Sequence, residues 1–231
     1  MEAVKKVLRL NDNRSAFAAK EYDEKIKRTL PYYDEFYRQV VDLVKTCKPN
    51  ALKWLDVGCG TGKMAEAAFK NIEVEKFTFC DCSSEMLEIA KERFPYPNTE
   101  FILCEIQKIS NVNAYDVVTA IQVNHYLQKE ERKRAVRNCY QSLKEDGIFI
   151  SFENFAPFSD FGKAVYLSKW KAYQMQQGKT SLESDNHINR YNREYFPITL
   201  TEHLELLRNC GFRDAEILWI SNMQAGIWGI K

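Results

Sequence analysis

The sequence predicts an α/β protein with a mostly parallel sheet, and two observations support this prediction. Between residues 52 and 153, short apolar runs of strand type alternate with stretches of helical period. Such alternation is typical of parallel strands whose crossover helices cover both faces of a sheet. In addition, a glycine-rich turn joins the first apolar run to an Ala-rich helix, at the sheet edge where α/β proteins bind ligands.

The alternating region is expected to contain five strands and three helices. The strands are placed at residues 52–57, 76–81, 99–104, 115–121 and 147–153. The helices are placed at residues 62–70, 84–93 and 129–144. Ser83 has the position of an N-cap for the second helix, and Asp146-Gly147 marks the turn into the fifth strand.

The chain divides into four expected parts, which are an N-terminal helical cap, a core, a lid insertion and the C-terminal part of the core sheet. They cover residues 1–47, 48–153, 154–197 and 198–231. Six aromatic residues lie between Phe17 and Tyr37 in the cap. They either pack the cap on the sheet or cover a site at its edge.

The lid insertion interrupts the alternation after residue 153. It is expected to contain an amphipathic helix over residues 161–177 and a polar loop over residues 179–192. A further helix begins at the capping pair Thr199 and Glu202, and Gly211 ends it. Two closing strands are placed at residues 216–221 and 226–231.

The composition is that of a folded protein without a strong charge. The 231 residues are 45% hydrophobic and 28% charged, and the net charge is +1. This balance gives no electrostatic argument for nucleic acid or an anionic membrane, and no apolar run is long enough to span a bilayer. Because the N-terminus also lacks a secretory signal, the protein is expected to be cytoplasmic, as a monomer or homodimer.

Two residue clusters are expected to have no binding role. Cys80 and Cys82 have the spacing of half a metal site, but no second pair or nearby histidine completes it, so no metal is expected. Acidic residues flank a basic stretch that consists of Arg132, Lys133, Arg134 and Arg137. Such mixed charge is typical of a solvated helix face rather than an RNA-binding surface.

The most informative motif is the turn from Asp56 to Gly62, with the sequence D-V-G-C-G-T-G. Glycines allow positive φ angles and let a ligand approach the backbone. Asp81 follows Gly62 by 19 residues, at the end of the next strand. There, nucleoside-binding α/β proteins place the acid that accepts hydrogen bonds from ribose. The spacing is not that of a dinucleotide site, because Lys63 stands where a third glycine would be required.

This arrangement resembles motif I and its partner acid in class I S-adenosylmethionine (SAM) dependent methyltransferases. The resemblance is specific over residues 52–153 and implies a Rossmann-like sheet of seven strands that ends in an antiparallel pair. It also implies SAM as cofactor and S-adenosylhomocysteine as product. By position in the family's pattern, the implied cofactor residues are Asp56, Gly58, Cys59, Gly60, Asp81, Cys82, Met86, Glu105, Ile106, Ile121 and Gln122.

Two of these positions keep alternatives open. Met86 is either an adenine contact or a core residue in the first turn of its helix. Glu105 stands where the family more often has aspartate, so the backbone of Ile106 is the alternative contact to the adenine amino group.

A looser similarity covers the whole chain. Tyr22-Asp23, the later Pro31 and Tyr33, the lid insertion and the C-terminal ending are together similar to the carboxy-SAM synthases of tRNA wobble modification. This similarity adds Tyr22 to the expected cofactor residues. It also places Arg190 where such enzymes hold the transferred carboxylate. Motif I, in contrast, keeps the ordinary methyltransferase form.

His125 and Glu153 are the candidate catalytic residues, because both follow strands of the expected sheet. His125 is either a base or a group that satisfies a loop. Glu153 is either an acid/base or orienting group, or a solvated strand end. The candidate substrate residues come from the lid and are Trp170, His187, Arg190 and Tyr191.

Aromatic residues mixed with one arginine could hold a flat or anionic small molecule, or they could simply fasten the lid. The sequence therefore predicts a SAM-dependent methyltransferase that acts on a small-molecule acceptor. A carboxy-SAM synthase and a non-enzymatic SAM-binding protein are the alternatives.

Overall fold

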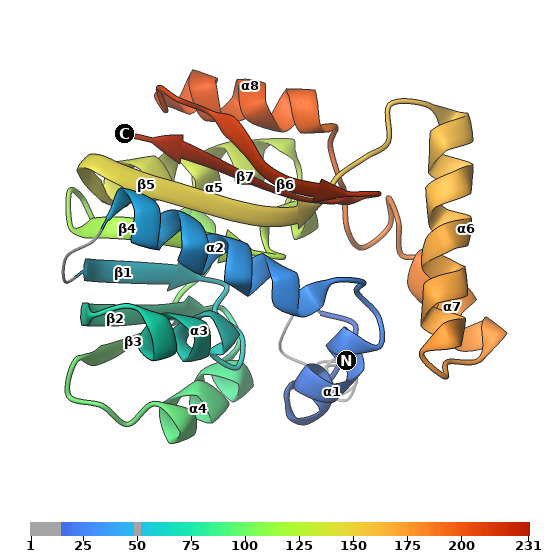
Figure 1. The fold of residues 1–231 in the computed structure, drawn as a ribbon, viewed down its shortest axis with the longest axis horizontal. Helices are drawn as coiled ribbons and strands as arrows, with labels where there is room; N and C mark the ends of the chain where they lie inside the picture. Colours follow the sequence, from blue (N-terminus) through green and yellow to red (C-terminus); the bar gives the residue numbers. More distant parts are fainter. Residues whose placement is uncertain (1–14, 49–51) are drawn as a thin grey trace, which may run out of the picture.

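A seven-stranded sheet with the order β3-β2-β1-β4-β5-β7-β6 forms the centre of the computed structural model, which describes residues 15–48 and 52–231 (Figure 1). The strands are β1 (Leu52–Val57), β2 (Val74–Asp81), β3 (Thr99–Leu103), β4 (Tyr115–Ile121), β5 (Leu143–Asn154), β6 (Glu216–Ser221) and β7 (Gln224–Ile230). The strands β1 to β5 pair in parallel, and β7 runs antiparallel to both β5 and β6. The predicted fold class is therefore confirmed.

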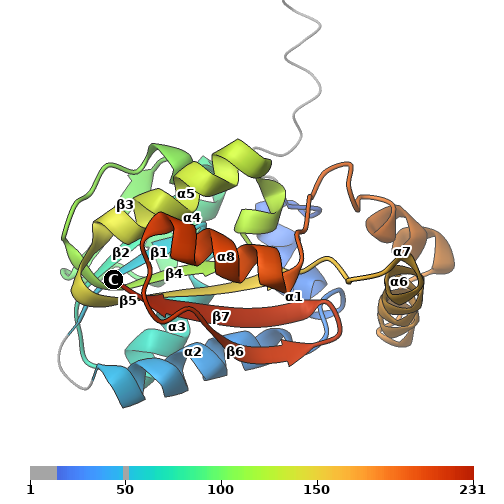
Figure 2. The ribbon, with the colours of Figure 1, turned by 90° about the horizontal axis from the view of Figure 1, so that it is seen from above.

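Helices cover both faces of this sheet (Figure 2). They are α2 (Tyr33–Cys47), α3 (Lys63–Asn71) and α4 (Ser84–Arg93) in one core cluster, and α5 (Lys129–Ser142) and α8 (Leu200–Cys210) in the other. Successive side chains of a strand point to opposite faces, so Trp54 and Leu55 of β1 belong to different clusters. This burial on both faces explains why the central strands appear in the sequence as continuous apolar runs.

Several predicted boundaries differ from the observed ones. The helix expected at residues 129–144 ends at Ser142, because β5 begins at Leu143 rather than at residue 147. The polar loop expected at residues 179–192 is wrong, since α7 (Ser181–Ile188) lies within it. A capping box formed by Thr180 and Glu183 starts this helix. The spacing of these two residues is the sequence signal that indicates α7. The part of the predicted cap at residues 1–14 lies outside the described residues.

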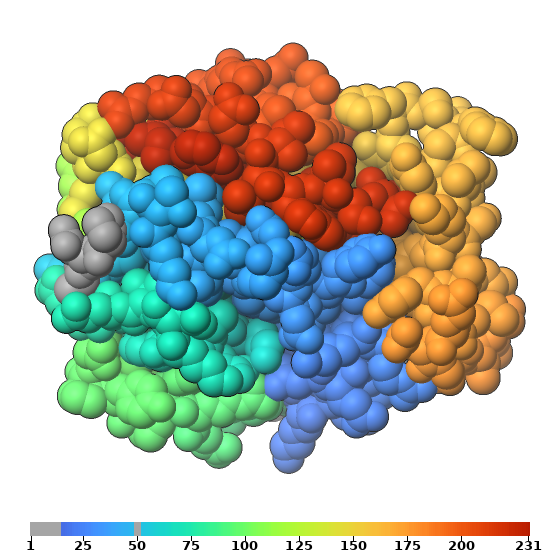
Figure 3. Space-filling view, in the orientation of Figure 1, coloured from blue at the N-terminus to red at the C-terminus, as the bar shows by residue number. Residues whose placement is uncertain are grey.

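The lid helices α6 (Asp160–Gln176) and α7 lie beside the short cap helices η1 (Ala19–Glu21) and α1 (Tyr22–Lys27). Long-range hydrogen bonds join the two parts. Trp170 Nε1 donates to the Thr29 carbonyl at 2.6 Å, the Tyr173 hydroxyl to the Lys27 carbonyl at 2.9 Å, and Arg28 Nε to the Gln177 carbonyl at 2.9 Å. Figure 3 shows the resulting continuous surface of cap and lid.

The aromatic residues of the cap serve both expected purposes. Phe36 is fully buried and stacks on Phe152 of β5, with 5.1 Å between the ring centroids. Tyr22, in contrast, lines cavities at the carboxyl edge of the sheet. Within the described part of the chain, every helix is too short or too polar to cross a membrane.

Candidate functional site

The glycine turn between β1 and α3 leaves its middle residue open to a ligand. Gly58, Gly60 and Gly62 have φ angles of 66°, 53° and 89°, which side chains rarely adopt. A Cβ atom on Gly58 would lie 2.3 Å from Val123 Cγ2, and one on Gly62 would lie 2.6 Å from Phe94 Cε2. A Cβ on Gly60 would meet nothing within 4 Å. The backbone at Gly60 therefore borders open space, as close contact with a ligand requires.

The Asp81 carboxylate is fixed against this turn. Its Oδ2 accepts a hydrogen bond from the Gly60 amide at 2.8 Å, and its Oδ1 accepts one from the Ser83 amide at 2.9 Å. An ionised carboxylate is a strong acceptor of hydrogen bonds from hydroxyl groups. Ser83 caps α4 as predicted, because its side chain accepts from the Met86 amide at 3.2 Å.

A cleft with about 730 Å³ of empty space lies at the carboxyl edge of the sheet. Ten of the twelve predicted cofactor residues line it, namely Tyr22, Gly58, Gly60, Asp81, Cys82, Met86, Glu105, Ile106, Ile121 and Gln122. The other two, Asp56 and Cys59, line an adjoining cavity under the glycine turn, which we call the loop chamber. The cleft walls also include Cys104, Gln107 and Tyr126, which have no distinctive sequence signal.

Asp56 is a buried carboxyl group in the loop chamber. Thr119 Oγ1 donates to it at 2.7 Å, and Trp54 Nε1 donates in turn to Thr119 at 2.9 Å. Burial raises the pKa of Asp56 to about 7, although the hydrogen bond from Thr119 acts in the opposite direction. A positive group in this chamber would therefore stabilise the charged form of Asp56 strongly.

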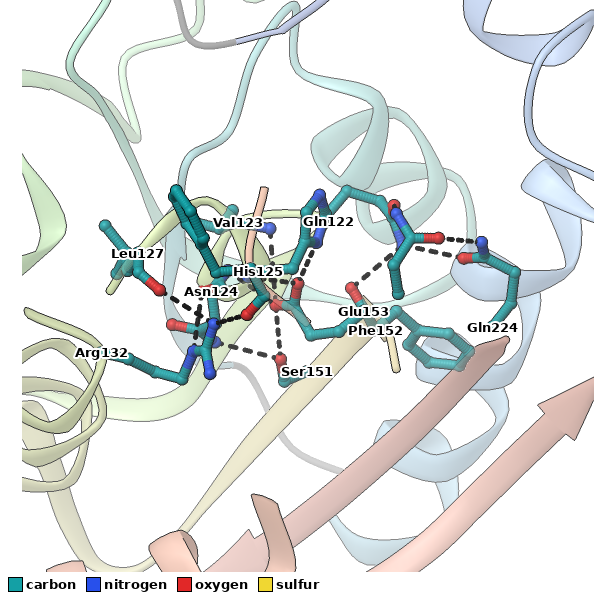
Figure 4. Close-up of polar contacts among 12 residues, drawn as sticks. Gln122, Val123, Asn124, His125, Leu127, Arg132, Ser151, Phe152, Glu153 and Gln224 are labelled. Carbon is teal, nitrogen blue, oxygen red and sulfur yellow. Dashed lines mark hydrogen bonds and ion pairs between the residues drawn. The ribbon is translucent and has the colours of Figure 1, made fainter. Parts of the chain in front are cut away.

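His125 and Glu153 form a buried pair at the ends of β4 and β5 (Figure 4). The distance from His125 Nδ1 to Glu153 Oε2 is 2.6 Å. Oε1 of the same carboxylate accepts from the Asn124 amide and from Ser151 Oγ, both at 2.9 Å. Burial raises the pKa of Glu153, but these hydrogen bonds and the imidazole outweigh it and hold the pKa below its usual range.

Glu153 is therefore ionised and acts as an acceptor, rather than lying in solvent as the alternative prediction had it. Because an ionised carboxylate cannot donate, the proton between the two side chains belongs to His125 Nδ1. In the neutral imidazole the lone pair is then on Nε2. His125 also lines a second cavity, described next.

The second cavity lies under the lid and has about 370 Å³ of empty space; we call it the acceptor pocket. Three of the four predicted substrate residues line it, namely Trp170, His187 and Arg190. Tyr191 is not among the lining residues and packs edge-on against Tyr195, with 5.8 Å between the ring centroids. Tyr195, another aromatic residue of the lid, does line the pocket.

Arg190 is a permanent cation in the lining of the acceptor pocket. It is only 8% exposed, and its Nε donates to Glu194 at 2.7 Å. It also hydrogen-bonds Tyr126, which belongs to both the pocket and the cleft. His187 adds no second charge, because burial, followed by nearby Lys179, lowers its pKa to about 3.

Arg132 differs from its prediction as part of a solvated basic face. It is 3% exposed, while its neighbours Lys133, Arg134 and Arg137 are exposed as expected. Its guanidinium donates to the carbonyls of Asn124 at 2.9 Å and Leu127 at 2.8 Å, and also to that of Phe196 (Figure 4). Arg132 thus holds the turn that carries His125, a role that charge patterning could not distinguish.

Gln122, which lines both the cleft and the pocket, belongs to a ring of three hydrogen-bonded amide side chains. Gln122 donates to Gln224 at 3.2 Å and accepts from Asn154 at 3.2 Å, and Gln224 donates to Asn154. Gln122 has a φ of 61°, so this ring of hydrogen bonds holds a residue in a sparsely populated conformation. These residues are far apart in the sequence, and no local pattern announces them.

Comparisons with known proteins agree with this geometry. Residues 55–147 match the model of a methyltransferase domain family. The carboxy-SAM synthase of Nautilia profundicola is 23% identical over 203 residues, which cover 87% of this chain and 86% of that protein. The malonyl-[acyl-carrier protein] O-methyltransferase of Acetivibrio thermocellus is 25% identical over 78% of this chain and 58% of its own length.

A solved structure shares the fold. The 1,6-didemethyltoxoflavin-N1-methyltransferase of Burkholderia thailandensis, solved with S-adenosylhomocysteine, has a TM-score of 0.61 at 13% identity, over 92% of this chain and 84% of that one. The cofactor of the matched family is SAM, and the open glycine turn with Asp81 fits its adenosine moiety. With this fold, matched domain and set of relatives, the chain is a class I SAM-dependent methyltransferase with a looser similarity to the carboxy-SAM synthases.

Proposed function

We propose that this enzyme transfers the methyl group of SAM to a small-molecule acceptor held under the lid. The observation that carries the proposal is the position of Tyr22, which lines the cleft, the loop chamber and the acceptor pocket. The adenosine end, the amino-acid end and the methyl group of SAM differ in chemistry, so each requires its own cavity. These cavities must adjoin, because the methyl carbon must face the acceptor. Holding the two reactants in line supplies much of the catalysis.

The cleft fits the adenosine end of SAM. Asp81 would accept hydrogen bonds from the ribose hydroxyls, while Cys82 and Met86 would pack on the adenine ring. Glu105 or the backbone of Ile106 would contact the adenine amino group. In the loop chamber, the Asp56 carboxylate and the backbone at Cys59 would receive the amino-acid end of the cofactor. SAM supplies a methyl group on a positive sulfur, which leaves as a neutral thioether.

His125 is placed to act as the general base of this reaction. Its Nε2 is the nitrogen with the lone pair, and the residue lines the acceptor pocket. Glu153 is a positioning residue, since its oxygens are occupied by His125, by Ser151 and by amides of the turn. It sets the tautomer and orientation of the imidazole and stabilises the imidazolium that forms.

The lid residues would determine which acceptor enters. Trp170 and His187 pack edge-on, with 5.2 Å between ring centroids, and present flat apolar surfaces. Arg190 provides charge for an anionic group. Tyr191 would act indirectly, by supporting Tyr195 from behind. We also propose a cytoplasmic location, which the absence of disulfides among the described cysteines supports.

The proposal is tested by turnover with a panel of small phenols, thiols, amines and carboxylates. The purified enzyme is incubated with SAM and each acceptor, and S-adenosylhomocysteine and the methylated product are measured together by mass spectrometry. We expect stoichiometric formation of both with at least one acceptor class. SAM binding without turnover on any member of the panel would contradict methyl transfer to a small molecule.

Carboxy-SAM synthesis is the second candidate, and the position of Arg190 favours it. Arg190 borders the cavity into which a carboxylated methyl group would extend, and several relatives are named carboxy-SAM synthases. Native mass spectrometry of the enzyme as purified separates the two candidates. Bound SAM or S-adenosylhomocysteine supports methyl transfer, whereas a ligand heavier than SAM by one carboxylate supports the second candidate. In that case Arg190→Ala should abolish retention of the heavier ligand and spare SAM.

A further inference from the structure

The buried hydroxyl of Tyr195 in the acceptor pocket has no hydrogen-bond partner within residues 15–48 and 52–231, and its side chain is only 2% exposed. His125 also lines this pocket, and its Nδ1 is engaged by Glu153. Buried polar groups are nearly always paired, because leaving one unpaired costs stability. An unpaired hydroxyl in a cavity wall therefore indicates a ligand that forms the missing hydrogen bond.

The two side chains are neighbours. The rings of His125 and Tyr195 pack edge-on at 85°, with 5.9 Å between their centroids, and both line the acceptor pocket. The Phe196 amide donates to the His125 carbonyl at 2.6 Å, which ties the two segments together. Both side chains can therefore contribute to one binding site. Burial raises the pKa of Tyr195, so its hydroxyl keeps its proton and can donate it in a hydrogen bond.

We propose, on the basis of the methyl-transfer function above, that the acceptor is a hydroxyl compound of phenol or enol type and that its oxygen is methylated. The Tyr195 hydroxyl donates a hydrogen bond to the acceptor oxygen, and His125 Nε2 accepts the proton from it. The oxygen lone pair forms the new bond to the methyl carbon, while the electrons of the carbon–sulfur bond remain on sulfur. The products are the methyl ether, S-adenosylhomocysteine and a protonated His125.

This pair of groups suits oxygen better than nitrogen or sulfur. A phenol with a pKa of about 10 is mostly protonated at neutral pH, so it needs a base. A thiol with a pKa of about 8.5 ionises more readily without help. A neutral amine attacks through its own lone pair and loses a proton only afterwards, so a buried hydroxyl donor aimed at it competes for that lone pair. The pocket lining of Trp170 and His187 suits a flat acceptor, and Arg190 favours a negative substituent on it.

The acceptor atom is tested with three matched series, the ortho, meta and para isomers of hydroxybenzoate, aminobenzoate and mercaptobenzoate. Ring and carboxylate are shared, so the series differ in the attacking atom. We expect the highest kcat/KM with a hydroxybenzoate isomer and a methyl ether as product. Faster methylation of an amino or mercapto isomer would overturn this inference and still support methyl transfer. No turnover with any acceptor would contradict the methyl-transfer function itself.

The role of Tyr195 is tested by Tyr195→Phe, which removes the hydroxyl and keeps the ring. We expect kcat/KM for the hydroxyl acceptor to fall at least tenfold, with the Kd for SAM and the melting temperature nearly unchanged. His125→Gln should lower kcat about a hundredfold and leave the Kd for SAM nearly unchanged. Tyr166→Phe is the matched control, because Tyr166 is a lid tyrosine in α6 that does not line the acceptor pocket. Equal kcat/KM in Tyr195→Phe and wild type would overturn the assignment.

Discussion

The imidazole of His125 is bonded through Nδ1 to the Glu153 carboxylate at 2.6 Å, and both side chains are almost completely buried. The two residues are 28 apart in the sequence, and β4, which precedes His125, pairs with β5, which contains Glu153. The pair leaves Nε2 of His125 outside the bond to Glu153, and it explains the buried glutamate near the end of β5.

Glu153→Gln should lower kcat by roughly 10²- to 10⁴-fold, because a neutral amide no longer fixes the tautomer of His125. The Kd for SAM should change little, since Glu153 does not line the cleft. Steady-state kinetics and calorimetric titration on the same preparation check both statements. If Glu153→Gln kept the wild-type kcat on every acceptor, the roles assigned to His125 and Glu153 would be wrong.

The contribution of Asp56 to the stability of the ligand-free enzyme should decrease as the pH rises from about 4 to 7. The pKa of Asp56 is raised from 3.8 to about 7 in the folded protein, so the folded state holds a proton that the unfolded state releases in this range. At about 1.4 kcal/mol per pKa unit, the ionised Asp56 lowers the free energy of unfolding above pH 7 by at most about 4 kcal/mol. Denaturant titrations of the wild type and Asp56→Asn at pH 5 and pH 8 test this. Asp56→Asn should lose less stability than the wild type between the two pH values, and an equal loss would contradict the assignment.

The glycines of the turn should respond differently to alanine. Gly58→Ala should reduce stability by roughly 1–3 kcal/mol, because the new Cβ would lie 2.3 Å from Val123 at a positive φ. Gly60→Ala meets no neighbour, so its cost should be about 1 kcal/mol, while SAM affinity should fall at least tenfold. Thermal denaturation and titration with SAM separate the two effects. Normal SAM affinity in Gly60→Ala would show that the cofactor does not approach this backbone.

Arg132→Met should reduce stability by roughly 3 kcal/mol or more, because three carbonyl groups lose a charged donor inside the protein. The exposed neighbour Arg134→Met is the matched control and should change stability by less than about 0.5 kcal/mol. Urea denaturation of both variants makes the comparison. Equal losses of stability in Arg132→Met and Arg134→Met would contradict the buried role of Arg132 and favour a solvated basic face.

The grouping of residues in the cleft could be predicted from the sequence because its signals are local. The glycines, Asp81 and Ser83 lie within one strand–helix–strand unit, where spacing alone determines position. The sheet was predictable for the same reason, since buried parallel strands leave continuous apolar runs. α7 could also have been found from Thr180 and Glu183, but polar composition concealed its capping box.

The acceptor half could not be predicted in the same way. Whether Arg132 faces solvent or three carbonyls depends on the turn at residues 124–127 and on Phe196, 64 residues away. The ring of Gln122, Asn154 and Gln224 likewise joins separate segments. The unpaired hydroxyl of Tyr195 becomes visible only when the lid is in place. Such contacts are long-range, so periodicity and capping rules carry no information about them.

Binding of SAM to Asp81→Ala, measured by calorimetric titration beside the wild type, tests the central assignment most directly. The substitution removes two charge-assisted acceptors from the cleft wall, worth about 1.5–3 kcal/mol each. The exposed Asp214→Ala serves as the control for loss of a carboxylate. The predicted result is at least a hundredfold weaker binding by Asp81→Ala and unchanged binding by the control. Wild-type affinity in a folded Asp81→Ala would contradict the assignment of this cleft to SAM.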